Sequence, residues 1–240
     1  MLNKAVLAVL ASTLLSTHAW ADEPATNWIN VAETSKFIWE AKSGSGGVAD
    51  MDGKKNIAYS YVYQNGDKEK KTYEYGQIFV KLDACRKGYG YIYYNDMQGK
   101  YTGKDAFVRF NNTVADALGS VACDAWDKDT KQVSREDKSD TWVVAAESEK
   151  SNRKYSLKTD TVRKRNYNGK PAIAALSSNY DPSTERTTYS EYVIPTSECK
   201  RGYGTIYQLD FDGALTEKYD VVLSGSSVIA NIANTLCQNM

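Results

Sequence analysis

Apolar and polar residues alternate with a period of two along much of the chain, and this pattern predicts strands. Tyrosines alternate with small or branched residues over 59–63, and a second alternating run covers 73–82. Such alternation places one set of side chains on the core face of a sheet. Residues 64–67 (QNGD) lie between these runs and contain an Asn-Gly pair typical of a hairpin turn. Two further strands are expected over 88–95 and 101–110, joined by a turn at 97–100.

The period changes to three and four after residue 112, which predicts a helix. Apolar residues over 114–121 fall on one face, and Asn112 or Thr113 is placed to cap the helix. A similar run covers 228–236 and is also preceded by a serine that can cap it. Each predicted helix therefore follows a group of predicted strands.

The stretch 83–123 recurs as 197–237 at a constant offset of 114, without a gap and with thirteen identical positions in forty-one. The same offset pairs Trp28 with Trp142 and Lys36 with Lys150. The chain is therefore interpreted as a tandem duplication of a unit of about 100 residues, a common size for a small domain. The identical residues of the first copy are Cys85, Gly88, Tyr89, Gly90, Ile92, Tyr93, Asp96, Gly99, Thr102, Lys104, Val108, Val114 and Cys123.

The four cysteines allow three pairings. Equal spacing in both units favours Cys85 with Cys123 and Cys199 with Cys237, because a duplicated domain keeps its own bridge. A metal site of four cysteines is the alternative, but such sites use short paired spacings that this chain lacks. The predicted fold is α+β: two tandem small domains, each an antiparallel sheet packed with a C-terminal helix and closed by one disulfide.

Domain boundaries follow from composition. Residues 1–21 have the charged start, short apolar run and small residues before the cleavage point of a secretory signal peptide. The first repeat is then placed at 22–123, a polar linker at 124–140 and the second repeat at 141–240. No later segment is apolar enough to span a membrane, so an exported protein without a transmembrane segment is expected.

Composition argues against most kinds of active site. The only histidine, His18, lies in the predicted signal peptide, so histidine-dependent catalysis and histidine metal ligands are excluded from the exported chain. All four cysteines are assigned to bridges. We therefore expect no catalytic residues, no metal site, no cofactor and no enzymatic activity. The 30 basic residues balance the 30 acidic ones, which gives no indication of a nucleic-acid partner.

Two matching hexapeptides are the most specific local signal, CRKGYG at 85–90 and CKRGYG at 199–204. Basic and aromatic side chains in this order predict a contact surface for an anionic ligand. The structural alternative is a disulfide-anchored turn into a strand, in which the tyrosine packs. The candidate binding residues are Arg86, Lys87, Tyr89, Lys200, Arg201 and Tyr203.

Two other stretches have both a functional and a structural interpretation. Arg163, Lys164, Arg165 and Lys170 surround residues 166–169 (NYNG) and form either an anion-binding loop or a solvated hairpin tip. The sequence DFDG at 210–213 resembles a fragment of a calcium loop but lacks the full ligand series, which favours a turn.

Several features together resemble the surface-adhesin protein E family of Gram-negative bacteria: an early tryptophan in each unit, tyrosine-rich strands, a cysteine opening a strand, a Tyr…Asp…Gly hairpin, and a closing helix that ends in cysteine. The hairpin residues are Tyr93, Asp96 and Gly99, and Tyr207, Asp210 and Gly213. The resemblance covers 28–123 and 142–237. It implies a small antiparallel sheet packed on a helix, and binding of host extracellular-matrix and serum proteins. The chain differs from the family in being duplicated and in lacking a lipid-modified cysteine at the cleavage site.

The leading hypothesis is a non-enzymatic exported protein of the cell envelope that engages a protein or glycan partner. Its location is then the periplasm, the cell surface or the medium. The alternative is a periplasmic inhibitor or immunity protein against an envelope-degrading enzyme such as a lysozyme, since small disulfide-bonded β domains also serve that role.

Overall fold

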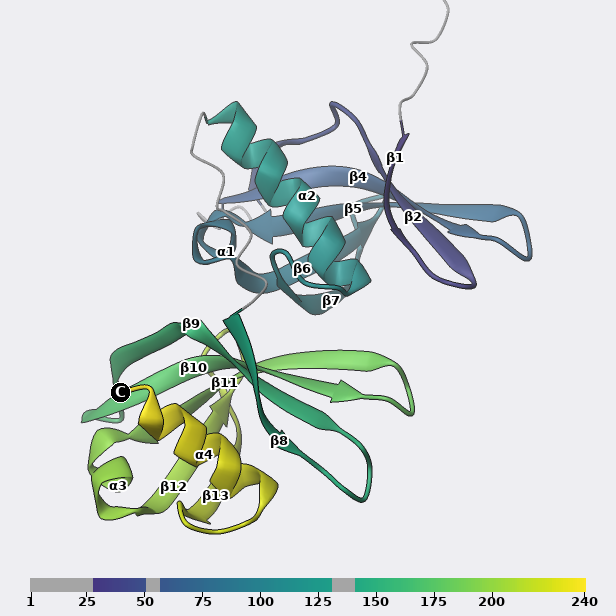
Figure 1. Ribbon diagram of the computed structural model, residues 1–240. Helices are drawn as coiled ribbons and strands as arrows, with labels where there is room; N and C mark the ends of the chain where they lie inside the picture. Colours follow the sequence, from purple (N-terminus) through teal and green to yellow (C-terminus); the bar gives the residue numbers. More distant parts are fainter. Residues whose placement is uncertain (1–27, 51–56, 131–140) are drawn as a thin grey trace, which may run out of the picture.

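The computed structural model describes residues 28–50, 57–130 and 141–240 (Figure 1). The predicted signal peptide at 1–21 lies outside these ranges. We refer to residues 28–130 as the first half and residues 141–240 as the second half. The first half contains β1 Trp28–Glu33, β2 Phe37–Lys42, β3 Gly47–Asp50, β4 Ile57–Asp67, β5 Thr72–Lys81, α1 Leu82–Lys87, β6 Tyr89–Asp96, β7 Tyr101–Val108 and α2 Val114–Asp129. The second half contains β8 Trp142–Glu147, β9 Lys154–Tyr167, β10 Lys170–Asp181, β11 Arg186–Pro195, α3 Thr196–Arg201, β12 Tyr203–Leu209, β13 Leu215–Val222 and α4 Val228–Gln238.

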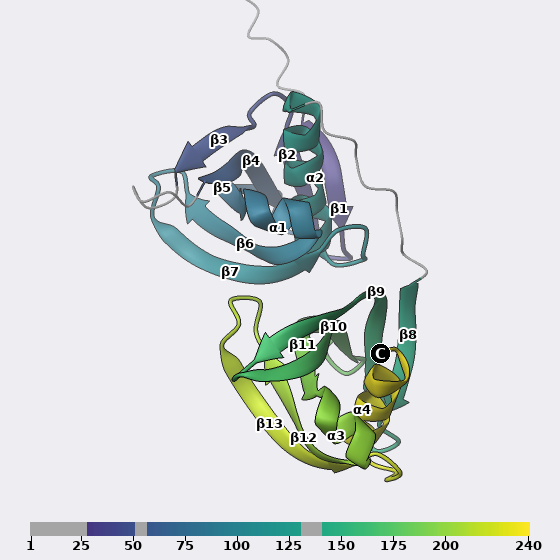
Figure 2. The ribbon, with the colours of Figure 1, turned by 90° about the vertical axis from the view of Figure 1, so that its left-hand side faces the viewer.

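The strands form two antiparallel sheets, and the predicted α+β class is confirmed. The first sheet has the order β1-β2-β4-β5-β6-β7, with β3 also pairing with β4. The second sheet has the order β13-β12-β11-β10-β9-β8. Helix α2 covers one face of the first sheet and α4 one face of the second, as the two ribbon views show (Figures 1 and 2). The second sheet is a meander, and the first departs from one at β2 and β3, which both pair with β4.

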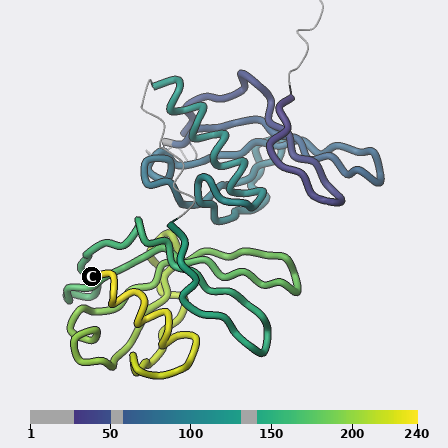
Figure 3. The backbone as a smooth tube through the Cα atoms, viewed as in Figure 1, coloured from purple at the N-terminus to yellow at the C-terminus, as the bar shows by residue number. Residues whose placement is uncertain are grey.

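The element bounds of the two halves follow the offset seen in the sequence. β1 and β8, β5 and β11, α1 and α3, and β7 and β13 differ by 114 residues at both ends. The halves differ where β2 and β3 of the first are replaced by the single strand β9 of the second. The backbone trace shows the same course for both halves (Figure 3).

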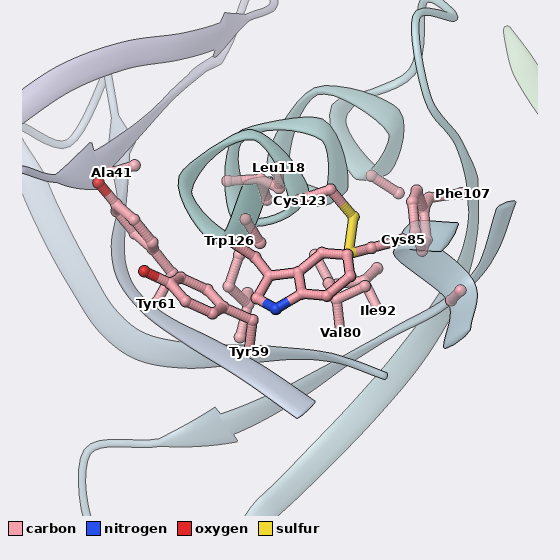
Figure 4. Close-up of a cluster of buried hydrophobic side chains, with 14 residues drawn as sticks. Ala41, Tyr59, Tyr61, Val80, Cys85, Ile92, Phe107, Leu118, Cys123 and Trp126 are labelled. Atoms are coloured by element: carbon pink, nitrogen blue, oxygen red, sulfur yellow. A yellow bond between two sulfur atoms is a disulfide. The ribbon is translucent and has the colours of Figure 1, made fainter. Parts of the chain in front are cut away.

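Each half has its own buried cluster and its own disulfide. The bonds are Cys85–Cys123 and Cys199–Cys237, which is the expected pairing. In the first cluster the Trp126 indole lies between the rings of Tyr59 and Tyr61 and the disulfide (Figure 4). In the second cluster Ile206, Ile232 and Leu236 are fully buried. These separate cores are what two domains would require, but the domain division itself remains a prediction.

Helix α2 is longer than the sequence pattern indicated. The sequence predicts an end near Cys123 and a linker over 124–140, whereas the helix continues to Asp129. The first six residues of the predicted linker are therefore helical, and the assignment is wrong there. Trp126 is 3% exposed in the core, and Asp127 pairs with the buried Arg109. Residues 131–140 of the predicted linker lie outside the described ranges.

Two further local predictions need correction. Residues 64–67 do not form a turn, because β4 continues to Asp67 and the turn follows it, with Lys71 at a φ of 57°. A Cβ on Gly66 would lie 2.7 Å from the Tyr73 ring, so this glycine is needed for close packing across the strands rather than for a turn. Cys85 does not open a strand but lies in the short helix α1, and Cys199 lies likewise in α3.

Local signals explain the elements that were predicted correctly. Thr113 caps α2 in a capping box with Asp116, and Ser227 caps α4. The side chain of Asp96 accepts hydrogen bonds from the backbone of Gln98 and Lys100, which fixes the turn before β7. Asp210 does the same for the backbone of Asp212 and Ala214, so the DFDG stretch is a turn.

Candidate functional site

The six predicted binding residues occupy equivalent places in the two halves. Arg86 and Lys87 end α1 and Tyr89 begins β6, and their counterparts end α3 and begin β12. Between helix and strand, Gly88 and Gly202 adopt φ values of 84° and 79°. Only glycine adopts this left-handed conformation without strain, so the shared glycine of the motif has a structural role.

The contacts of these residues differ between the halves. Lys87 pairs with Asp83 at 3.0 Å, and the Arg86 guanidinium lies 5.5 Å from the centroid of the Trp126 ring. Arg201 lies 5.2 Å from the centroid of its neighbour Tyr203, which is exposed. Only Lys87 and Tyr89, of the six, line a cleft that lies between the halves. The two motifs are thus not brought together into one surface.

This cleft has a volume of about 680 Å³. Ligand sites commonly have volumes in this range. The first half contributes the junction of α1 and β6 and the segment that follows β7, and the second half contributes one stretch of β9. The lining residues are Lys87, Gly88, Tyr89, Val108, Arg109 and Phe110 from the first half, and Lys158, Asp160, Thr161, Val162 and Arg163 from the second.

A bulge in β9 forms the wall of the cleft in the second half. Leu176 pairs with Lys158 and Ala174 with Arg163, so residues 159–162 face a single residue of β10. The Thr161 hydroxyl accepts a hydrogen bond from the Leu176 amide at 2.9 Å and holds the bulge in place. Bulges of this kind redirect side chains and are frequent beside functional sites.

Every cationic side chain that lines the cleft has an acidic partner. Arg163 pairs with Glu191, which also pairs with Arg165 at 2.6 Å. Lys158 lies 3.4 Å from Asp160 and donates a hydrogen bond to the Thr141 hydroxyl at 2.7 Å. The cleft therefore presents oriented donors whose charges are largely compensated, rather than an unbalanced positive patch.

The segment after β7 gives the cleft its most constrained backbone. Phe110 has a φ of 63°, which is costly for a bulky side chain. Its amide donates to the Ser120 hydroxyl at 3.3 Å, and the Arg109 guanidinium lies 5.1 Å from its ring. Strained residues of this kind cluster at functional sites, so this position adds weight to the cleft as the candidate site.

Arg109 anchors this segment to the end of α2. Its side chain is only 2% exposed and pairs with Asp124 at 2.5 Å and Asp127 at 3.0 Å. The last turns of α2, which lie in the predicted linker, thus supply both carboxylates. Burial of a guanidinium is tolerated only with such partners.

Beside the cleft, hydrogen bonds to one buried carboxylate join the two halves. The Tyr189 hydroxyl of β11 donates to the Asp116 carboxylate at 2.7 Å and accepts from the side-chain amide of Asn111. Asp116 also accepts from the amides of Val108 at 2.7 Å and Thr113 at 2.9 Å. Burial raises the pKa of Asp116, and burial together with the neighbouring Asp116 raises the pKa of Tyr189. This carboxylate therefore accepts hydrogen bonds from both halves and forms part of the contact between them.

A second contact between the halves combines aromatic rings with an ion pair. Phe211, in the turn before β13, lies 5.4 Å from Tyr89 and 5.6 Å from Tyr91, ring centroid to centroid. Asp212 pairs with Lys104 at 3.1 Å, and the Lys104 ammonium lies 3.8 Å from the Tyr91 ring. Tyr89 therefore serves both the cleft and the contact between the halves.

Some of the residues that line the cleft lie in recognisable sequence motifs, and others do not. Lys87, Tyr89 and Arg163 were singled out, and all three line the cleft. Arg165 does not line the cleft but pairs with Glu191, the partner of Arg163. Residues 166–169 form the hairpin tip between β9 and β10. Arg109, Phe110 and Lys158 were missed, because no local pattern marks them. For Lys158, the offset of 114 gives one signal: the first half has Gly44 at the equivalent position, so the lysine is particular to the second half.

Comparisons of the chain with protein-family models, with curated proteins and with solved structures gave no match. The resemblance to the surface-adhesin protein E family therefore remains a prediction. Within the described ranges, no group of three or more His, Cys, Asp or Glu residues is placed to hold a metal ion. No helix among the described residues combines the length and apolar character needed to cross a membrane.

Proposed function

We propose that this chain is an exported, non-enzymatic binding protein built of two tandem α+β domains, and that it binds a protein or glycan partner in the cleft between its halves. The observation that carries this proposal is the cleft of about 680 Å³ lined by lysine and arginine side chains from both halves and by Tyr89. The two disulfides support export, since such bonds persist in oxidising compartments.

Carboxylate, sulfate or phosphate groups are the ligand chemistry that the cleft favours. Arg163 is 41% exposed at its side chain while one of its amino groups is held by Glu191, so its remaining donors are oriented before a ligand arrives. Preorganisation of this kind reduces the entropy lost on binding. Because Arg163 and Lys158 are paired with Glu191 and Asp160, an anionic ligand has to take the place of one of these carboxylates.

We infer a non-catalytic role from the surroundings of Asp116, whose pKa is raised by burial. A carboxyl group whose pKa is shifted by burial is a candidate for proton transfer. Asp116 is such a group, but it accepts hydrogen bonds from two backbone amides and from Tyr189. Its environment is explained by the contact between the halves.

The proposal is tested with two matched double variants. Arg86→Ala with Lys87→Ala alters the motif beside the cleft, and Lys200→Ala with Arg201→Ala alters the same motif away from it. Binding to heparin and to poly-glutamate is measured by calorimetry. We expect the first variant to weaken binding about tenfold, as the loss of a charge-assisted contact does. The second should bind like the unmodified chain.

Three outcomes would contradict the proposal. If neither polyanion binds, the cleft is not an anion site. Equal loss in both variants would place binding at the motif rather than at the cleft. Inhibition of a lysozyme by a chain that binds neither polyanion would favour the alternative role as an envelope inhibitor.

Export is tested separately by locating the protein. Immunoblots of culture medium, of intact cells treated with protease and of periplasmic extract distinguish the compartments. Protein in the medium or cleaved on intact cells fits a partner outside the cell. Protein found only in the periplasm directs the search to envelope components, and protein found only in the cytoplasm would overturn the proposal.

A further inference from the structure

The two halves meet through two different faces of the same fold. The first half contributes a docking face on β6 and β7, which comprises Tyr89, Lys104 and Val108. The second half contributes a receiving face, which comprises Tyr189, Phe211 and Asp212. Tyr89 meets Phe211 and Lys104 meets Asp212, while Val108 lines the cleft beside them.

The halves are arranged in nearly the same orientation. Helices α2 and α4 run in the same direction, and the β4–β5 and β10–β11 hairpins project to the same side (Figure 1). Because the halves are related by a shift rather than by a twofold rotation, the contact between them uses only one face of each half. It leaves a docking face free on the second half and a receiving face free on the first.

The offset of 114 identifies the residues of these free faces. Tyr203, Lys218 and Val222 correspond to Tyr89, Lys104 and Val108, and all three pairs are identical in type. Tyr75, Met97 and Gln98 correspond to Tyr189, Phe211 and Asp212. In the second set the tyrosine is identical, the second residue stays apolar and the third stays polar.

The equivalent residues differ in exposure as the free faces require. Val108 is 1% exposed beside the cleft, whereas the identical Val222 is 58% exposed. Tyr203 is 57% exposed, Tyr75 51% and Met97 48%. Apolar and aromatic side chains thus remain uncovered on the two free faces, at positions equivalent to those that lie between the halves. Such uncovered patches commonly mark interaction sites.

We propose that a second copy of this chain covers these faces, with the docking face of one copy on the receiving face of the next. Tyr203 of one copy then contacts Met97 of the next, and Lys218 donates a hydrogen bond to the side-chain oxygen of Gln98. The contact is head-to-tail, so it permits association beyond a dimer. This inference does not depend on the ligand proposed for the cleft.

Contact between copies is weaker than contact within the chain. Asp116 accepts the hydrogen bond of Tyr189 within the chain, and the offset places Ala230 at the equivalent position. Asp212 forms the ion pair with Lys104, and Gln98 stands at its equivalent position. The hydrogen bond to a buried carboxylate and the ion pair are therefore both lost between copies. We expect reversible association at about 10–1,000 µM, in the range of small transient interfaces.

The test uses one variant for each face and a matched control. Met97→Glu places a charge on the receiving face and Tyr203→Glu places one on the docking face. Tyr180→Glu changes an exposed tyrosine of β10 that belongs to neither face. Weight-average mass is measured by sedimentation equilibrium from about 1 µM to about 1 mM.

The unmodified chain and Tyr180→Glu should gain mass with concentration, and each face variant should remain a single chain. An equal mixture of Met97→Glu and Tyr203→Glu should form dimers and nothing larger, because only one pair of intact faces remains. Constant mass of the unmodified chain up to about 1 mM would overturn the proposal. So would a mixture that stays monomeric while the unmodified chain associates, since that result indicates a symmetric contact.

Discussion

Removing one hydroxyl group tests whether the two halves are joined as the structure indicates. In the variant Tyr189→Phe, Asp116 loses the donor that crosses from the second half at 2.7 Å, while the bonds from Val108 and Thr113 remain. Asp116 is 0% exposed, so water does not replace the lost donor. A hydrogen bond to a charged group contributes about 1.5–3 kcal/mol, and we expect a loss of that size in the free energy of unfolding.

The duplicated fold supplies a matched control. Tyr75 is the equivalent residue of the first half, lies 6.0 Å from Trp28 as Tyr189 lies 6.3 Å from Trp142, and is 51% exposed. Because this residue is half exposed, Tyr75→Phe should change the free energy of unfolding by no more than about 0.5 kcal/mol.

Urea unfolding followed by circular dichroism measures both variants. Slopes of about 1–3 kcal/mol/M translate the expected loss into a midpoint shift of about 1 M for Tyr189→Phe. Because the bond joins the halves, the shift appears in whichever unfolding transition occurs first. Equal shifts in the two variants would refute the contact between the halves. So would a coupling energy near zero between Tyr189→Phe and Asp116→Ala in a double-mutant cycle.

Three other predictions follow from the described contacts. Replacing Cys199 with serine opens a bridge that spans 38 residues and should destabilise the second half by about 4 kcal/mol, with the first half unchanged in limited proteolysis. The variant Arg109→Met leaves Asp127 buried without its partner and should lower the free energy of unfolding by about 3–5 kcal/mol, against at most about 0.5 kcal/mol for Arg153→Met at an exposed ion pair; equal losses would contradict the buried anchor. Burial raises the pKa of Asp116 above 3.8, so the folded chain holds this proton to higher pH than the unfolded chain, and its stabilising contribution is complete below pH 3.8 and lost as the pH rises through the folded pKa. The stability of the unmodified chain relative to Asp116→Asn should therefore fall as the pH rises from 3.8, and a difference that grows would contradict this assignment.

Features that depend on short stretches of chain were predictable from the sequence. The disulfide pairing, the helix caps at Thr113 and Ser227 and the turns at Asp96 and Asp210 all follow from residues within a few positions of each other or from the offset. Alternating tyrosines correctly marked strands. In these cases the tertiary contacts agree with the local preference.

The errors arose where a distant residue changes what a local pattern means. The charged end of α2 has the composition of a linker, but Arg109 is buried against Asp124 and Asp127, and Trp126 packs into the core. The Asn-Gly pair before Asp67 has the composition of a turn, yet it lies within a strand pair. In both cases tertiary contacts override the local preference.

The candidate site could be predicted only in part for the same reason. Lys87 and Tyr89 belong to a motif visible in the sequence, and Arg163 belongs to a visible basic cluster. Nothing local relates them to each other, because they come from separate halves and meet only when those halves dock. Lys158 lines the cleft next to the bulge at 159–162, which no alternating pattern reveals.

The matching motifs show that position in the fold, rather than sequence, decides what surrounds each copy. CRKGYG and CKRGYG form the same short helix, the same left-handed glycine and the same strand start. Yet Tyr89 packs against Phe211 at the edge of the cleft, whereas Tyr203 is 57% exposed. Since the local fold is shared, the difference comes from the neighbouring half. A function assigned to the motif as such would predict two equal sites, whereas a function assigned to the cleft predicts one.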